Sequence, residues 1–157
     1  MPNLTETFAR CMPAVALALG GCGVGPVAEV GPGGALLPCP AAPHCVSSID
    51  QDADHHVDPL IFRGPAAQAR AQLIQALKSL PRTQIVDEQA GYVSAEAHST
   101  VMRFVDDVQC QIKPAAAGGG GIIEVRSSSR VGYYDFGANR ERVESLRKAF
   151  ATQAGHP

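Results

Sequence analysis

Apolar residues recur at helical spacing in two segments of this chain and alternate with polar residues between them. The first segment opens at Gly64-Pro65 and ends at Pro81, with Leu73 and Leu77 on its apolar face. Proline is favoured in the first turn of a helix and stops a helix further along. The second runs from about 139 to 153, with Asn139 expected as the N-cap. Two amphipathic helices are therefore predicted.

Four strand-like runs lie between these helices, at 83–88, 92–99, 101–113 and 122–131. Turn residues separate them, including Ala90-Gly91 and the tetraglycine 118–121. Such short connections favour antiparallel neighbours. The order of helix, strands and helix predicts an α+β fold, a two-layer sandwich with an antiparallel sheet of three to four strands and both helices on one face.

The chain before residue 58 shows no sustained period. Residues 1–21 are typical of a signal peptide, with a short apolar core ending at Leu19-Gly20-Gly21-Cys22. This ending resembles a bacterial lipoprotein box, in which Cys22 is lipidated; a soluble N-terminal helix and an ordinary secretory signal are the alternatives. Residues 22–37 are rich in glycine and proline and are expected to form a tether. The single globular domain is assigned to 38–157, and 38–59 is expected to be irregular.

Charge and cysteine usage narrow the partners. The formal net charge is −2, with no block of like charges, which argues against nucleic acid as a partner. A lipid on Cys22 followed by Gly23 predicts the cell envelope, at the periplasmic face of the outer membrane, with the membrane as a partner. Cys39 and Cys45 lie close enough to form a disulfide there, although free thiols or a metal site with His44 are the other options. No motif indicates a cofactor or a catalytic metal.

Strand parity predicts which residues face away from the helices. Apolar residues such as Val93, Phe104, Val108 and Cys110 occupy the inner row, which they share with Asp106. Asp106 therefore needs an arginine or backbone donors as partners. The remaining positions form what we call the outer face: Tyr92, Ser94, Glu96, His98, Arg103, Asp107, Gln109, Gln111, Glu124, Arg126, Ser128 and Arg130.

The outer face allows several interpretations. Solvated ion pairs are the structural one. The functional one is that Arg126 and Arg130 bind a carboxylate, phosphate or sulfate group, or a protein partner, while Glu96 and Asp107 orient them. A hydrolase-like enzyme using either carboxylate as acid or base is the alternative, and a metal held by Glu96, Asp107 and His98 lacks supporting spacing.

A loop of sequence GYYDFGA, residues 132–138, joins the last strand to the last helix. Asp135 is expected to accept N–H groups at the start of the helix or to pair with Arg140. The expected ligand-binding residues are thus Glu96, Arg103, Asp107, Arg126, Ser128, Arg130, Asp135 and Arg140.

Three segments in order carry a resemblance to a family. They are CPAAPHCVSS at 39–48, the run 96–107 that contains RFVDD, and VRSSSRVGYYDFGANRER at 125–142. Together they resemble the bacterial and chloroplast family known as domain of unknown function family 1499, over most of 38–147. The family implies no activity. His44, Tyr134 and Gln109-Cys110 depart from its usual pattern, which bears on the polarity of the loop and the outer face.

Overall fold

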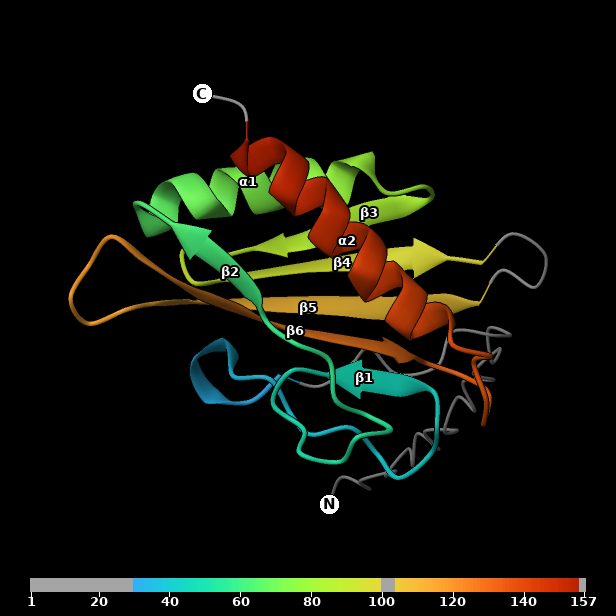
Figure 1. The fold of residues 1–157 in the computed structure, drawn as a ribbon. Helices are drawn as coiled ribbons and strands as arrows, with labels where there is room; N and C mark the ends of the chain where they lie inside the picture. Colours follow the sequence, from blue (N-terminus) through green and yellow to red (C-terminus); the bar gives the residue numbers. More distant parts are fainter. Residues whose placement is uncertain (1–29, 100–103, 156–157) are drawn as a thin grey trace, which may run out of the picture.

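The computed structural model describes residues 30–99 and 104–155 of the chain. It contains two α-helices, six strands and one 3₁₀ turn (Figure 1). The elements are η1 (Pro32–Gly34), β1 (Cys45–Ser47), β2 (Leu60–Arg63), α1 (Ala66–Ser79), β3 (Thr83–Glu88), β4 (Tyr92–His98), β5 (Val105–Pro114), β6 (Gly120–Ser129) and α2 (Ala138–Ala154). Among these described residues, no helix has the length and apolar character needed to cross a membrane.

The strands form one antiparallel sheet in the order β1-β6-β5-β4-β3, and β2 also pairs with β6. Both helices cover the same face of this sheet (Figure 1). The α+β class predicted from the sequence is confirmed, but the sheet has six strands rather than three to four. β1 and β2 span only three and four residues. Such short runs in a proline-rich segment carry too little alternation to be recognised.

The core lies between the sheet and the two helices. Val93, Val108 and Val125 of the predicted inner row are fully or almost fully buried against Leu73 of α1 and Leu146 of α2. Each helix contributes one apolar face, as the helical spacing of its apolar residues predicts. The parity rule thus assigns the two faces of the long strands correctly.

Two local expectations are wrong. Phe104 was placed on the inner row, but 41% of its surface is exposed because it precedes the start of β5, where strand parity does not yet apply. Asn139 was expected as the N-cap of the second helix, but the cap is Gly137 and Asn139 lies inside the first turn. Asn139 is fully buried, and its side-chain amide is satisfied by hydrogen bonds such as the one that Nδ2 donates to the His44 carbonyl.

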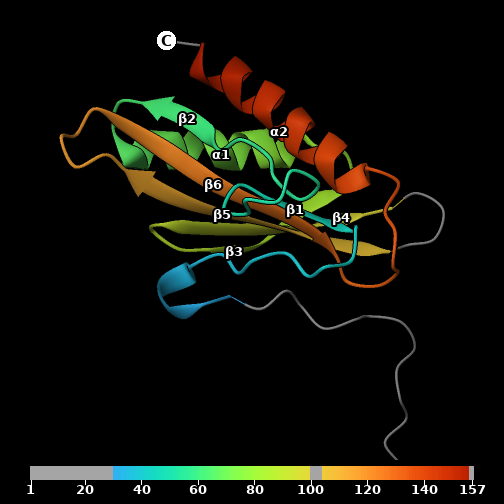
Figure 2. The same ribbon diagram turned by 60° about the horizontal axis from the view of Figure 1, so that its bottom comes forward.

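Residues 30–50 cross the outer face of the sheet, opposite the helices (Figure 2). The α-carbon of Gly34 lies close enough to Tyr92 that a Cβ on it would approach the Tyr92 Cβ to 3.2 Å, and Leu36 is buried. The end of the expected tether is therefore packed against the domain. The segment 38–59 is largely irregular, as expected, except for the short strand β1. The signal peptide and Cys22 lie outside the described residues, as does Arg103.

Candidate functional site

The middle of the outer face is a buried polar layer rather than an open surface. Asp107 is 4% exposed, Gln109 2% and Arg126 8%. Ser128 is also buried, opposite Cys45 of β1 and Asp107 of β5 in the strand register. A polar side chain under such cover needs a hydrogen-bond partner, because burial without one is costly. The partners divide the layer into two groups around its two arginines.

Arg130 is held by two carboxylates. Its Nε donates to Asp107 Oδ2 at 2.9 Å, and its Nη2 donates to Asp107 Oδ1 at 2.6 Å and to Glu96 Oε1 at 2.5 Å. The hydrogen bond to Asp107, followed by the bond to Glu96, outweighs burial and raises the pKa of Arg130. Glu96 Oε2 also lies 3.8 Å from His98 Nε2. This guanidinium is therefore a neutralised structural cation.

Arg126 has a neutral partner instead. Its Nη1 donates to Gln109 Oε1 at 3.1 Å, and Gln109 Nε2 donates to the Tyr92 hydroxyl oxygen at 3.2 Å. No hydrogen-bond acceptor among the described residues reaches Arg126 Nε. Burial lowers the pKa of Arg126, although Asp107 and Asp50 oppose that effect through space. In the part of the chain that the structure describes, this buried cation therefore has no direct carboxylate partner.

A pocket of about 310 Å³ adjoins this layer. Glu96 and Asp107 line it together with hydroxyl and amide groups from Tyr92, Ser94 and Gln109. Val30, Val86 and Asp87 complete its wall. Gln109 lines the pocket and also accepts a hydrogen bond from Arg126. The Arg126 guanidinium therefore lies behind Gln109, next to the pocket wall.

Asp135 and Arg140 belong to a different part of the molecule. Asp135 Oδ1 accepts the N–H of Gly137 at 2.9 Å and its Oδ2 accepts that of Asn139 at 3.0 Å. Burial raises the pKa of Asp135, but these backbone hydrogen bonds outweigh burial and lower it overall. Arg140 does not pair with it and donates to the carbonyls of His56 and Asp54. Both residues line a separate pocket of about 370 Å³.

A second polar network, on the helix side, was only partly foreseen. Asp106 pairs with Arg142 Nη2 at 2.5 Å, so the ion pair expected for this carboxylate is confirmed. Arg142 Nη1 also donates to Asn139 Oδ1 at 2.6 Å and to Ser127 Oγ at 3.1 Å. The charged run near the chain's end gave a signal for such a network, but no spacing rule identifies Arg142 as the partner.

A family described as protein of unknown function (DUF1499) matches residues 35–150, which is most of the chain. The chain belongs to the DUF1499 family. The DUF1499 match includes Cys39 and Cys45, the whole sheet, α1 and most of α2. A comparison with curated proteins gives no match.

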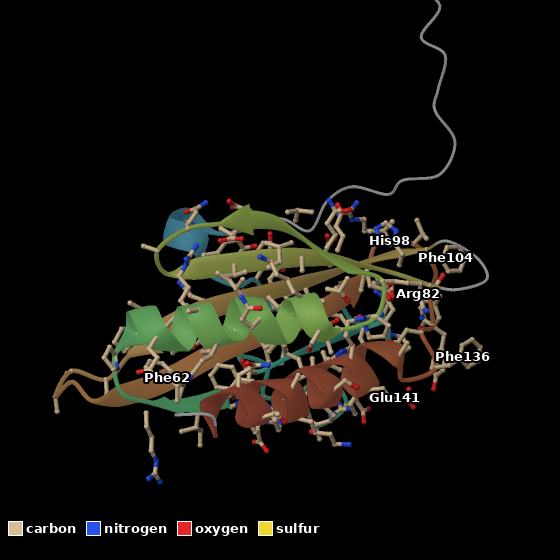
Figure 3. The ribbon with its side chains drawn as sticks, turned by 90° about the horizontal axis from the view of Figure 1, so that it is seen from above. Phe62, Arg82, His98, Phe104, Phe136 and Glu141 are labelled. Carbon is tan, nitrogen blue, oxygen red and sulfur yellow. A yellow bond between two sulfur atoms is a disulfide. The ribbon has the colours of Figure 1, made fainter. Side chains whose placement is uncertain are left out.

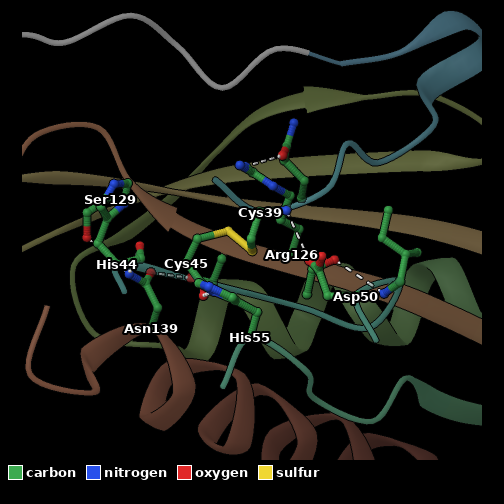
Figure 4. The surroundings of a disulfide bond; sticks show 12 residues. Cys39, His44, Cys45, Asp50, His55, Arg126, Ser129 and Asn139 are labelled. Atoms are coloured by element: carbon green, nitrogen blue, oxygen red, sulfur yellow. Dashed lines mark hydrogen bonds between the residues drawn. A yellow bond between two sulfur atoms is a disulfide. The ribbon is translucent and has the colours of Figure 1, made fainter. Parts of the chain in front are cut away.

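In this DUF1499 chain a disulfide joins Cys39 and Cys45, one of the three states that the sequence left open (Figure 4). The backbone N–H of Cys39 also donates to Asp50 Oδ2 at 3.0 Å. Between the cysteines, the His44 carbonyl accepts hydrogen bonds from Ser129 N and Asn139 Nδ2. The disulfide therefore closes a short loop, 39–45, whose His44 contacts Ser129 and Asn139. Through it, residues 30–50, which we call the covering segment, are attached to the end of β6 and the start of α2.

The described residues offer no group of three or more histidine, cysteine, aspartate or glutamate side chains placed to hold a metal ion. Cys110 is fully buried in the core, and burial raises its pKa to about 12. Its thiol is therefore a packing group, as the inner-row position predicted.

Proposed function

We propose that this chain is a non-enzymatic binding domain of the cell envelope that takes an anionic ligand on its outer face at Arg126. The observation that carries the proposal is the buried guanidinium whose Nε has no acceptor among the described residues. A buried charge is stable only when it is paired or well hydrogen-bonded. An anionic group bound here supplies the missing partner.

The neighbouring arginine supports the choice of Arg126 rather than Arg130. Arg130 already binds two carboxylates through three hydrogen bonds. An incoming anion would have to displace Glu96 or Asp107 and leave it unpaired. At Arg126 an anion competes with the amide oxygen of Gln109, which is a neutral acceptor rather than a carboxylate. Of the two arginines that the sequence suggested for binding an anion, we therefore propose Arg126 as the one that contacts the ligand and Arg130 as a structural residue.

The adjoining pocket supports a ligand that carries hydroxyl groups beside its acid. Glu96, Asp107 and Asp87 are acceptors, and Tyr92, Ser94 and Gln109 both donate and accept. A bare inorganic anion would contact Arg126 and leave the polar groups of the pocket unused. A hydroxylated carboxylate or phosphate, such as a sugar acid, uses both and is the ligand class we propose.

The hydrolase-like alternative is less well supported. It requires Glu96 or Asp107 to exchange a proton with a substrate. Both carboxylates accept hydrogen bonds from Arg130, so each is already engaged as the partner of a structural arginine. Binding without turnover therefore fits the geometry better.

The envelope location rests on the lipoprotein-like Cys22 and is supported by the disulfide, since disulfides persist in oxidising compartments. We propose a lipid anchor on Cys22 at the periplasmic face of the outer membrane. Mass spectrometry of the purified protein should find cleavage before Cys22 with added acyl chains. An intact Met1 terminus contradicts the anchor but not the binding site.

Thermal denaturation with phosphate, sulfate, glucuronate and galacturonate tests the binding site. A ligand at 100 times its Kd stabilises the folded state by about 2.7 kcal/mol. We expect the uronic acids to give the larger shift and Arg126→Met to remove it. Arg63→Met is the matched control, since Arg63 is an exposed arginine on β2, and it should keep the shift. The proposal fails if Arg126→Met responds like the wild type or if none of the four anions shifts the wild type.

A further inference from the structure

The aromatic side chains of the described residues fall into two groups. Phe62, Tyr92 and Phe150 are buried. The other four are exposed, with 41% of the surface accessible for Phe104, 74% for Tyr133, 58% for Tyr134 and 87% for Phe136. We call these four residues the aromatic end. Large apolar side chains collected at one exposed place commonly mark an interaction surface.

The aromatic end is built from two adjoining connections. Phe104 leads into β5, and the other three residues lie between β6 and α2. The two connections are tied together where Arg130 N donates to the Val105 carbonyl at 3.1 Å. Figure 3 places Phe104 and Phe136 at the same end of the molecule, whereas Phe62 lies at the other end.

The loop holds its rings in place. Phe136 has a φ of 55°, in the left-handed region that a bulky residue rarely adopts. The ring of Tyr134 meets that of Phe136 edge to face, with centroids 5.1 Å apart. Asp135 fixes the backbone on the C-terminal side through Gly137 and Asn139. Strained backbone that is held firmly and presents an apolar ring to solvent is typical of a functional contact.

We propose that the aromatic end docks on the surface of a lipid bilayer and inserts Phe136 and its neighbours into the interfacial region. Both residue types suit this region, because the apolar ring of phenylalanine or tyrosine enters the acyl boundary while the tyrosine hydroxyl stays hydrated. Tyr133, Tyr134 and Phe136 stand on the connection between β6 and α2, where more than half of the surface of each is exposed. This proposal rests on the lipid anchor at Cys22 proposed above.

The length of the chain before the domain supports a bilayer as the occupant. Cys22 and Val30 are 30 − 22 = 8 residues apart, which limits the span between them to about 28 Å. Val30 lines the same pocket as Asp107, and Phe104 lies three residues before Asp107, about 10 Å of extended chain. A lipid on Cys22 therefore leaves the aromatic end within reach of the membrane surface.

The chain contains no tryptophan, so a single introduced indole reports on one place. The full chain is purified from the membrane fraction as Phe136→Trp and, as control, as Ile61→Trp. Ile61 is 76% exposed on β2, away from the aromatic end. Each protein is reconstituted with phosphatidylcholine vesicles in which half of the lipid carries brominated acyl chains, and its mass reports whether Cys22 is lipidated.

We expect strong bromolipid quenching and a blue-shifted emission for Trp at 136 and little change for Trp at 61. If Cys22 is lipidated but position 136 is not quenched, docking is overturned while the anchor stands. Equal quenching at both positions indicates unspecific adsorption and also overturns docking. If Cys22 carries no lipid, the anchor fails, and selective quenching at 136 on added vesicles still decides for docking. A blue shift that grows with protein concentration before vesicles are added identifies a second copy as the occupant and overturns the proposal.

Discussion

Arg126 lies on β6 and Arg130 directly follows the end of that strand; the side chains of both are shielded from water, yet their surroundings differ. Removing one member of a buried ion pair is strongly destabilising, because the partner charge stays behind. Replacing a buried charge that has no charged partner removes a desolvation cost. The same substitution at these two positions should therefore have opposite consequences.

We expect Arg130→Met to lower the free energy of unfolding by about 3–5 kcal/mol, because Glu96 and Asp107 lose their common partner. Arg126→Met should be neutral or stabilising in the absence of ligand. Urea denaturation with unchanged m-values measures both. Equal destabilisation by the two substitutions would show that Arg126 is an ordinary structural residue.

At the level of helices and strands, the start of α2 depends on one carboxylate. Asp135 accepts the backbone N–H groups of Gly137 and Asn139, and its pKa is lowered in the folded state. Asp135→Ala should cost about 1 kcal/mol of stability. Glu141→Ala is the control, since Glu141 is an exposed acid in the same turn without a capping bond.

The cap also predicts a pH dependence. Since the folded pKa of Asp135 is depressed, its contribution is fully present above the unfolded value of 3.8 and is lost as the pH falls through the folded pKa. The stability difference between wild type and Asp135→Ala should shrink accordingly on acidification below pH 3.8. A difference that stays constant down to the acid limit contradicts a role for the charged cap.

The β5–β6 hairpin depends on a glycine. A Cβ at Gly121 would lie 2.3 Å from the Lys113 carbonyl oxygen and 2.7 Å from the Phe62 ring. We expect Gly121→Ala to cost about 1–3 kcal/mol through overpacking. Gly91→Ala is the matched control, since nothing lies within 4 Å of its Cβ position, and should change the midpoint of thermal unfolding little. Similar midpoints for the two variants would contradict the close approach of Phe62.

Sequence patterns predict the long elements better than the short ones. The helices and the strands β3 to β6 each repeat an apolar period often enough to be recognised. Their parity also places Glu96, Asp107, Arg126 and Arg130 on one face. Strand parity does not show that residues 30–50 cover that face. The polar layer that was expected to meet solvent or ligand directly is therefore found to be largely buried. The partner of each arginine depends on side-chain geometry, which spacing does not specify.

For the whole molecule, the disulfide fastens the covering segment to the sheet. Opening the Cys39–Cys45 loop should lower stability by about 2 kcal/mol, the entropy of a short closed loop. Thermal unfolding with and without a phosphine reductant measures the loss. Cys110→Ala should leave this redox dependence intact, because Cys110 is a buried free thiol. Rapid alkylation of Cys110 in the native protein would contradict its assigned place in the core.

The pairing of β6 also sets the order in which the chain can fold. β1 and β2 come early in the sequence, yet both bond to β6, and Ser48 Oγ accepts the N–H of Val125 from 77 residues away. Long-range pairings of this kind form slowly, because the loop between them must first be closed. The first two strands therefore cannot pair until β6 has been synthesised. Because β6 ends at residue 129 of 157, these two strands stay without their sheet partner for most of the time that the chain is being made.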